Sequence, residues 1–162
     1  MREFLVKQKL KFGGEKFDIL DEKGRIAYQA TGSFLQIPKT FVLKDRSGRV
    51  ISGIQKKVVS FFPKFKVDMK EGRDFWFKKK WSFFGDRYRL TNFGYEVRGN
   101  IWDLDFDLLD RQGGLVAEIS KELFHLTDHY SIKIYDEAAT ELVLSLVVAI
   151  DYVEAMEARN SR

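Results

Sequence analysis

An apolar stretch near the end of the sequence, residues 138–156, limits the folds open to this chain most strongly. Its centre, residues 142–150, is apolar at every position except Ser145. A helix that is apolar on all sides must be surrounded by protein, so this segment is expected in a core and not on a surface. A membrane span needs about 20 apolar residues with few charges, whereas Glu141, Asp151 and Glu154 lie inside this window. We therefore expect a buried helix and no transmembrane segment.

The residues around this stretch indicate where the helix begins and ends. Asp136 is a suitable N-cap, and Glu137 places a carboxylate in the first turn, where it complements the helix dipole. The valine-rich run 143–150 would also suit a buried strand by propensity alone. The length of the segment and its charged, alanine-containing end favour a helix over residues 138 to about 159. Inside it, Ser145 and Asp151 are expected to bond to the backbone of the surrounding strands.

Three turns of the same kind divide the rest of the chain into hairpins. Residues 21–24, 45–48 and 110–113 each begin with aspartate and end with glycine, and apolar runs flank each of them. An aspartate side chain can accept hydrogen bonds from its own downstream backbone, and glycine can take a positive φ. The three segments are therefore predicted to be hairpin turns.

Alternation of apolar and polar residues predicts many short strands between these turns. They are expected at residues 15–20, 25–31, 64–70, 75–81, 87–90, 95–98, 102–108, 115–119 and 130–135. With the runs that flank the turn at 45–48, this gives roughly ten to twelve strands and no strong amphipathic helix before residue 136, which is typical of a barrel or a sandwich. The fold class is therefore mainly β.

Length and composition favour one domain over residues 1–162, because a chain of this length can bury a substantial core without disulfides. It has no cysteine, which excludes disulfides and thiolate zinc sites and favours a reducing intracellular setting. The apolar run at residues 4–6 is too short for a secretion signal. We expect a cytoplasmic protein, either free or peripheral to a membrane.

The net charge of +4 is unevenly distributed. Residues 56–89 hold eleven basic and four acidic side chains, a net of +7, which leaves −3 for the remainder of the chain. A basic segment between near-neutral or acidic ends is a plausible contact region for an anionic partner.

The repeated apolar-Asp-x-x-Gly-x-apolar hairpins, followed by an apolar helix that contains Ala149-Ile150-Asp151, resemble the LURP-one-related family, the YxjI-like bacterial proteins and their plant relatives. That family shares the tubby C-terminal-like fold with the phospholipid scramblases. The resemblance covers essentially the whole chain and implies a closed antiparallel β-barrel of about twelve strands around a central hydrophobic C-terminal α-helix. It also implies phosphoinositide or membrane binding among relatives, but no residue-level lipid-binding motif matches here.

The basic segment supplies the candidate site for an anionic ligand, because aromatic residues alternate there with lysine and arginine. Such a pattern suits anionic phospholipid headgroups or, less well, a nucleic-acid backbone. The candidate residues are Lys64, Lys66, Trp76, Lys78, Lys79, Lys80, Arg87 and Arg89. Alternation places Trp76, Lys78 and Lys80 on one face of their strand and Lys79 on the other. The alternatives are a set of ordinary strands with lysines in water, and a protein-interaction or structural domain whose charges serve solubility.

No pattern in the sequence indicates catalysis, a cofactor or a metal. Asp103, Asp105 and Asp107 would share one strand face, but a calcium-loop pattern fails there, and a solvated acidic face is the simpler interpretation. His125 and His129 have metal-ligand spacing only on a helix, and no third ligand is indicated. We expect a non-catalytic protein. A small-molecule carrier is disfavoured, because a helix in the barrel leaves little cavity to fill.

Overall fold

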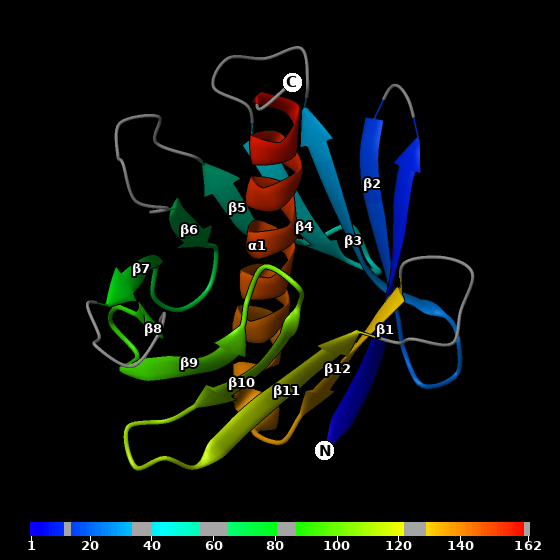
Figure 1. Cartoon of the computed structure of the whole chain (residues 1–162). Coiled ribbons are helices and arrows are strands. Elements are labelled where there is room, and N and C mark those ends of the chain that lie inside the picture. The colour runs from blue at the N-terminus through cyan, green and yellow to red at the C-terminus, as the bar shows by residue number, and fades with distance from the viewer. Residues whose placement is uncertain (12–13, 34–39, 56–64, 81–86, 122–128, 161–162) are drawn as a thin grey trace.

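Twelve antiparallel strands close into a barrel, and one long helix runs through it (Figure 1). We describe the fold from a computed structural model of the chain, which defines residues 1–11, 14–33, 40–55, 65–80, 87–121 and 129–160. The strands are β1 (Arg2–Lys11), β2 (Gly14–Leu20), β3 (Ile26–Ser33), β4 (Thr40–Asp45), β5 (Val50–Gln55), β6 (Phe65–Met69), β7 (Phe75–Lys80), β8 (Arg87–Leu90), β9 (Tyr95–Asn100), β10 (Asp105–Leu109), β11 (Leu115–Lys121) and β12 (His129–Ile134). The short 3₁₀ helix η1 (Glu137–Ala139) and the helix α1 (Thr140–Asn160) follow. The predicted closed barrel with a C-terminal helix is confirmed.

The first strand closes the ring. Each strand pairs with its neighbours in sequence, and β1 also pairs with β12, with Arg2 opposite Ile134 and Lys7 opposite His129. Phe4 and Val6 of β1 are buried, so this strand also contributes to the core. The alternation analysis did not predict a strand here, although the closed barrel requires one.

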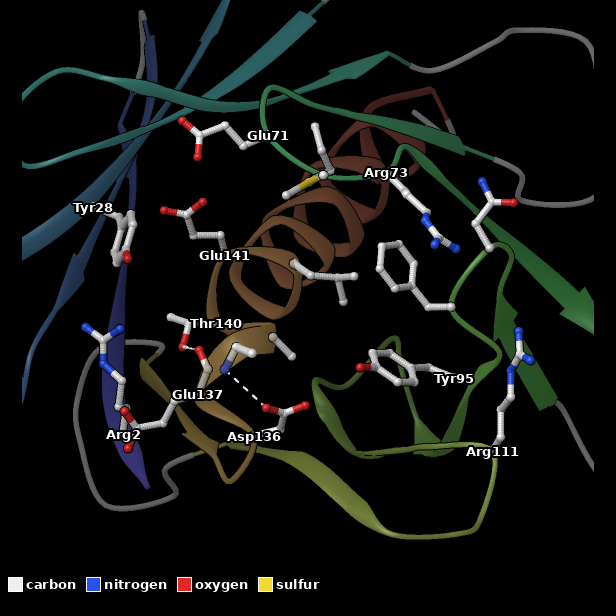
Figure 2. Close-up of a pocket in the computed structure, with 17 residues that line it drawn as sticks. Arg2, Tyr28, Glu71, Arg73, Tyr95, Arg111, Asp136, Glu137, Thr140 and Glu141 are labelled. Carbon is white, nitrogen blue, oxygen red and sulfur yellow. Dashed lines mark hydrogen bonds between the residues drawn. The ribbon is translucent and has the colours of Figure 1, made fainter.

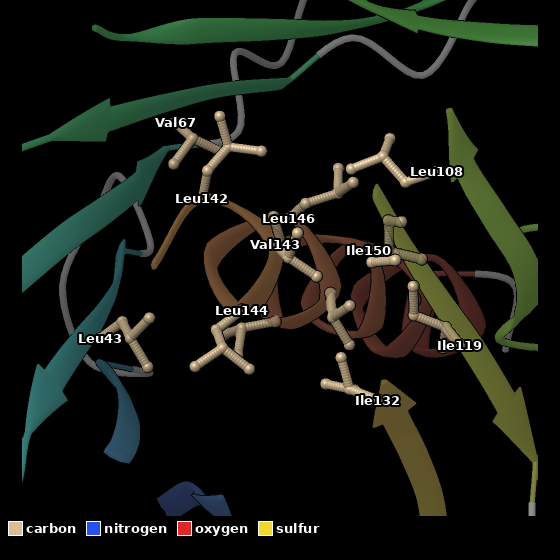
Figure 3. Close-up of a cluster of buried hydrophobic side chains, with 14 of the residues drawn as sticks. Leu43, Val67, Leu108, Ile119, Ile132, Leu142, Val143, Leu144, Leu146 and Ile150 are labelled. Atoms are coloured by element: carbon tan, nitrogen blue, oxygen red, sulfur yellow. The ribbon is translucent and has the colours of Figure 1, made fainter. Parts of the chain in front are cut away.

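Helix α1 fills the interior of the barrel. Its aliphatic side chains between residues 142 and 150 are at most 6% exposed. Figure 3 shows them directed to different sides of the barrel, with Leu146 and Ile150 near Leu108 and Ile119, and Leu144 toward Leu43. Among the described residues, no helix combines the length and the apolar character that a bilayer span needs. The apolar run is thus explained by contacts on every side of the helix.

The predicted N-cap is present. Asp136 has extended backbone, and its side chain accepts a hydrogen bond from the Ala138 N–H at 3.1 Å. The first turn differs from the prediction, because residues 137–139 form a 3₁₀ turn and the α-helix begins at Thr140. The Thr140 hydroxyl donates to the Glu137 carbonyl at 2.7 Å and so adds a bond across this tighter turn.

A pair of serines joins the helix to the wall of the barrel. The hydroxyl oxygens of Ser52 in β5 and Ser145 in α1 lie 2.6 Å apart, and both residues are fully buried. Ser145 also donates to the Glu141 carbonyl at 2.7 Å, so Ser52 is the donor to Ser145. The expectation that Ser145 bonds to strand backbone is therefore wrong: the carbonyl one turn earlier in its own helix is its nearest backbone acceptor. Asp151 is also buried, at 2% exposed.

The three Asp-x-x-Gly segments form turns of the same geometry, as predicted. In each, one carboxylate oxygen accepts from the N–H groups two and four residues later, at 2.7–3.0 Å. The glycines Gly24, Gly48 and Gly113 have φ of 71°, 88° and 83°. Each turn adjoins a shift in strand register, which fits a type I turn followed by a bulge. Asp21, Asp45 and Asp110 therefore fix both the turn and the pairing of its strands.

One predicted strand begins later than expected. The alternation over residues 102–108 predicts a strand there, but β10 begins at Asp105, and residues 101–104 form a turn. The Asn100 side chain accepts from the Trp102 and Asp103 N–H groups, and Leu104 has a φ of 52°. Local side-chain bonding to the backbone competes with strand pairing at this point.

Candidate functional site

The end of the barrel where α1 begins is built from tight turns. Because the strands are antiparallel, the connections β2–β3, β4–β5, β6–β7, β8–β9 and β10–β11 all lie at this end, together with the link from β12 to η1. We call this end the mouth. Its side chains come from segments that are far apart in sequence, and the turns hold them in place.

Arg49 connects three of the elements at the mouth. Its guanidinium contacts Asp45 in the same turn at 2.9 Å, Glu71 in the β6–β7 turn at 3.1 Å, and Glu141 in the first turn of α1 at 2.7 Å. The bond to Asp45 and the Glu141 carboxylate raise the pKa of Arg49. Hydrogen bonds from the Ser47 hydroxyl and from Arg49 lower the pKa of Asp45 to about 2. Arg49 thus links the start of α1 to the β4–β5 and β6–β7 turns.

We expect Asp45→Asn to destabilise the protein in a pH-dependent way. A folded pKa of about 2 is below the unfolded value of about 3.9, so the ionised carboxylate stabilises the fold above about pH 4, and this contribution is lost as the pH falls through about 2. Urea unfolding of the wild-type protein and of Asp45→Asn between pH 7 and pH 2 measures this effect. The difference in their free energies of unfolding should be constant at high pH and should shrink below about pH 4. Asp105→Asn, at an exposed position, is the control, and a pH-independent difference for Asp45→Asn would contradict the expectation.

A pocket of about 720 Å³ opens at the mouth (Figure 2). Its lining comes from the start of β1, from Tyr28 in β3, from the β6–β7, β8–β9 and β10–β11 turns, and from residues 136–142. Leu142 is 6% exposed and lies at its apolar floor with Ala139. The pocket lies at the rim beyond the first turn of the helix, so a filled barrel interior still leaves a cavity at its end.

The acidic residues of the pocket are engaged by partners within the protein. Glu71 and Glu141 both contact Arg49. Glu137 contacts the Met1 amino group at 2.9 Å, which lowers the pKa of Glu137. Asp136 caps the Ala138 N–H. Their negative charge is thus used to hold the helix start against the rim.

Three arginines line the same pocket. The Arg2 guanidinium carbon lies 5.0 Å from the centre of the Phe4 ring. Arg73 and Arg111 come from two different turns on the side of the pocket across from Glu141 and Tyr28 (Figure 2). Within the described part of the chain, neither Arg73 nor Arg111 has an acidic side chain within ion-pair distance. The positive charge of Arg73 and Arg111 is therefore local to this side of the pocket, since the lining as a whole holds four acidic residues and three arginines.

Two aromatic residues, Phe93 and Tyr95, also line the pocket. The rings of Phe93 and Tyr95 have centroids 5.8 Å apart, and both side chains are half-buried. Burial, followed by the nearby Asp136 and Asp110 carboxylates, raises the pKa of Tyr95. The pocket thus offers an apolar floor, an aromatic wall and two guanidinium groups.

The second candidate region is the outer face of β6, β7 and β8, which holds most of the residues selected from the sequence. Backbone register places Lys78 opposite Arg89 and Lys80 opposite Arg87, while Lys79 lies opposite the buried Tyr88. Residues that are directly opposite share one face of a sheet. Lys78, Lys80, Arg87 and Arg89 therefore share the outer face, and Lys79 has an inward position. We call the four outer positions and Trp76 the basic face.

Lys66 is held by acids next to the basic face. It lies opposite Trp76 in the register and forms ion pairs with Asp68 and Asp74. The bond to Asp68, followed by that to Asp74, raises the pKa of Lys66, and the same contact lowers the pKa of Asp74. Its charge is thus engaged by two carboxylates of the protein, so we leave Lys66 out of the basic face.

Of the other predicted positions, the structure describes Arg89 and Trp76 but not Lys64. Arg89 is exposed and lies between Lys78 and Glu96 in the register. Trp76 is half-buried, and its backbone N–H donates to the Thr91 hydroxyl at 3.0 Å. Lys64 lies outside the described residues.

The acidic and histidine patterns do not come together as sites. Asp103 lies in the β9–β10 turn, where it accepts from the Asn100 amide, and so it does not share a strand face with Asp105 and Asp107. His129 is buried in β12, and His125 lies outside the described residues. Among the described residues, no group of three or more His, Asp or Glu side chains is arranged to hold a metal ion.

The sequence analysis missed the pocket arginines, Arg73 and Arg111. Both lie in hairpin turns, and a signal for them exists: in an antiparallel barrel, every second connection lies at the same end. Counting the predicted strands would have placed the two arginines near the helix start. The omission of β1 does not affect this count, because even numbers of strands separate the β6–β7 turn, the β10–β11 turn and the link to the helix.

Comparison with known proteins agrees with this architecture. A sequence model of the LURP-one-related family matches residues 2–151. The chain is 22% identical over 153 residues to the uncharacterized protein YxjI of Bacillus subtilis (strain 168), covering 94% of each chain. The X-ray structure of the Arabidopsis thaliana protein AT5G01750 superimposes with a TM-score of 0.65 at 17% identity, covering 93% of this chain and 91% of that one. The structural likeness concerns the fold alone.

The family match spans nearly all of the barrel and the buried part of the helix, from β1 to Asp151. The hairpin turns and the apolar helix on which the resemblance was based are both present in the structure. This chain belongs to the LURP-one-related family.

Proposed function

We propose that this protein is a non-catalytic binding module that docks on anionic phospholipid headgroups through the basic face. The observation that carries the proposal is the register of β7 and β8, which places Lys78 opposite Arg89 and Lys80 opposite Arg87. Like charges directly opposite on neighbouring strands destabilise a sheet. An anionic surface would remove this repulsion, and each basic residue near such a membrane contributes about 1 kcal/mol.

Trp76 supports a membrane surface as the partner. It lies on the same strand as Lys78 and Lys80, at an outer position opposite Lys66. Tryptophan is enriched at membrane–water interfaces, where its ring lies at the level of the headgroups. A half-buried tryptophan beside four cationic positions therefore suits a lipid surface better than it suits a solvated strand.

Vesicle co-sedimentation tests the proposal. We expect the protein to sediment with vesicles that contain phosphatidylserine but not with phosphatidylcholine alone, and we expect added salt to weaken the binding. The triple change Lys78→Glu, Lys80→Glu and Arg89→Glu should reduce binding by about tenfold or more. The control, Lys16→Glu, Lys44→Glu and Lys121→Glu, alters the net charge equally at exposed positions of β2, β4 and β11 and should retain most of the binding.

Equal losses in the two triple variants would show that net charge alone matters, and this would overturn the docking face. An absence of preference for phosphatidylserine would overturn the lipid ligand. If the wild-type protein bound duplex DNA with a steep salt dependence and ignored vesicles, nucleic-acid binding would replace the proposal. A stable protein partner that tolerates the Lys78, Lys80 and Arg89 changes would favour an interaction domain.

A further inference from the structure

The pocket at the mouth is built separately from the basic face. It is formed by turns and by the helix start, whereas the basic face belongs to the outer side of strands β7 and β8. Its volume of about 720 Å³ is within the range of about 300–1,000 Å³ that small-molecule sites occupy. The rim therefore has room for a ligand even though the barrel interior is filled.

The charges of the pocket select the sign of that ligand. Glu71 and Glu141 are held by Arg49, and Glu137 is held by the Met1 amino group. Arg73 and Arg111 have no such partner among the described residues. A guanidinium group binds carboxylate and phosphate oxygens through paired N–H donors. An anionic group is thus the complement of the free side of the pocket.

Arg111 is held in position by the turn across from it. A Cβ added at Gly94 would lie 2.1 Å from Arg111 Nε and 2.7 Å from its Cγ, so the arginine side chain lies directly over the glycine. Gly94 also has a φ of 71°, which favours glycine. The β8–β9 turn therefore restricts the side chain of the β10–β11 turn, and a restricted arginine loses less entropy when it binds an anion.

The remaining wall of the pocket is apolar. Phe93 packs edge-on against the buried Phe75, with ring centroids 6.1 Å apart, and the partly buried Met69 and the buried Leu142 complete the lining. An ion that filled only the charged side would leave these surfaces in water. A ligand with an apolar part would cover them.

We infer that this pocket binds a small amphiphilic anion, whose carboxylate or phosphate group is held by Arg73 and Arg111 and whose apolar part lies on Phe93 and Leu142. The Ala138 N–H at the start of the helix is not a donor to the ligand, since it already donates to the Asp136 side chain. The ligand class follows from the side chains alone.

Titration calorimetry with four probes tests this inference on the full chain. Octanoate and monooctyl phosphate combine the two parts of the ligand, inorganic phosphate lacks the apolar part, and 1-octanol lacks the charge. We expect a Kd of about 1 mM or lower for at least one of the two amphiphiles, and binding about tenfold weaker or more for phosphate and octanol. The amphiphile with the lower Kd shows whether the pocket prefers a carboxylate or a phosphate group. NMR shift changes should appear at Phe93, Arg111 and Leu142.

Two variants with matched controls locate the site. Arg73→Met with Arg111→Met should weaken amphiphile binding by about tenfold or more, whereas Arg46→Met with Arg98→Met removes the same charge at exposed positions outside the pocket and should not. Gly94→Ala should displace Arg111 and weaken binding. Gly24→Ala has the same φ of 71° in open space, so it controls for the backbone effect.

The inference is overturned if octanol or phosphate binds as tightly as the amphiphiles, if neither amphiphile binds, or if each pocket variant behaves as its control does. Lys78→Glu with Lys80→Glu and Arg89→Glu should leave amphiphile binding intact, and the pocket variants should still sediment with vesicles. Failure of one proposal is thereby distinguishable from failure of the other.

Discussion

Replacing Leu146 by alanine is expected to lower the free energy of unfolding by about 3 to 5 kcal/mol. The side chain is fully buried in the middle of α1 and lies near Leu108 (Figure 3). Barrel strands surround the helix on all sides, so the wall cannot collapse into the space that the leucine leaves. The change therefore combines the lost burial of the side chain with a cavity that persists.

Urea unfolding of the Leu146→Ala variant measures this effect, with Leu115→Ala as its control. Leu115 is 41% exposed at the start of β11, so the same chemical change there should cost well under about 1 kcal/mol. If the two variants lost the same free energy of unfolding and their m-values were unchanged, α1 would not be the centre of the core.

Gly99→Ala is expected to cost about 3 to 5 kcal/mol for a different reason. Gly99 has a φ of 121°, and a Cβ there would lie 2.6 Å from the Asp105 carbonyl oxygen and 2.8 Å from the Phe106 Cα. Both atoms belong to the backbone of β10, which pairs with β9 at this point. An alanine must therefore strain its own backbone and also push the neighbouring strand away.

Gly72→Ala separates these two contributions. Gly72 has a φ of 98°, and a Cβ there would meet nothing within 4 Å, so only the backbone strain of about 1 to 2 kcal/mol applies. Thermal or urea unfolding of both variants gives the difference, which measures the close approach of β9 and β10. If Gly99→Ala cost no more than Gly72→Ala, the tight contact between these strands would be refuted.

The parts of the fold that were predicted correctly depend on short-range patterns. The Asp-x-x-Gly turns are local, since each aspartate bonds to backbone within four residues, and the apolar run of α1 has only one environment that can accept it. The strand over residues 87–90 was predicted with the bounds that the structure gives it. Strand β1 was missed, and its role in the fold depends on β12, more than a hundred residues away.

The candidate site was less predictable, because its charges are set by contacts between distant segments. The sequence shows Lys66 in a basic segment, but only the folded chain brings Asp74 to it. In the same way, nothing local indicates that Arg49 engages Glu71 and Glu141 and leaves Arg73 and Arg111 uncompensated. Net charge along a sequence therefore identified a basic region, but it did not identify which cations remain available to a ligand.

The pairing of β1 with β12 has a consequence for how the protein is made on the ribosome. The strand that completes the ring and the helix that fills it are synthesised after the eleven other strands. Until they emerge, the eleven preceding strands can form only an open sheet, whose apolar face and two edge strands are exposed to solvent. Closing a loop of this length is also slow. The barrel should therefore not close on the ribosome until β12 and α1 have emerged from it, and the nascent chain should depend on chaperones until then.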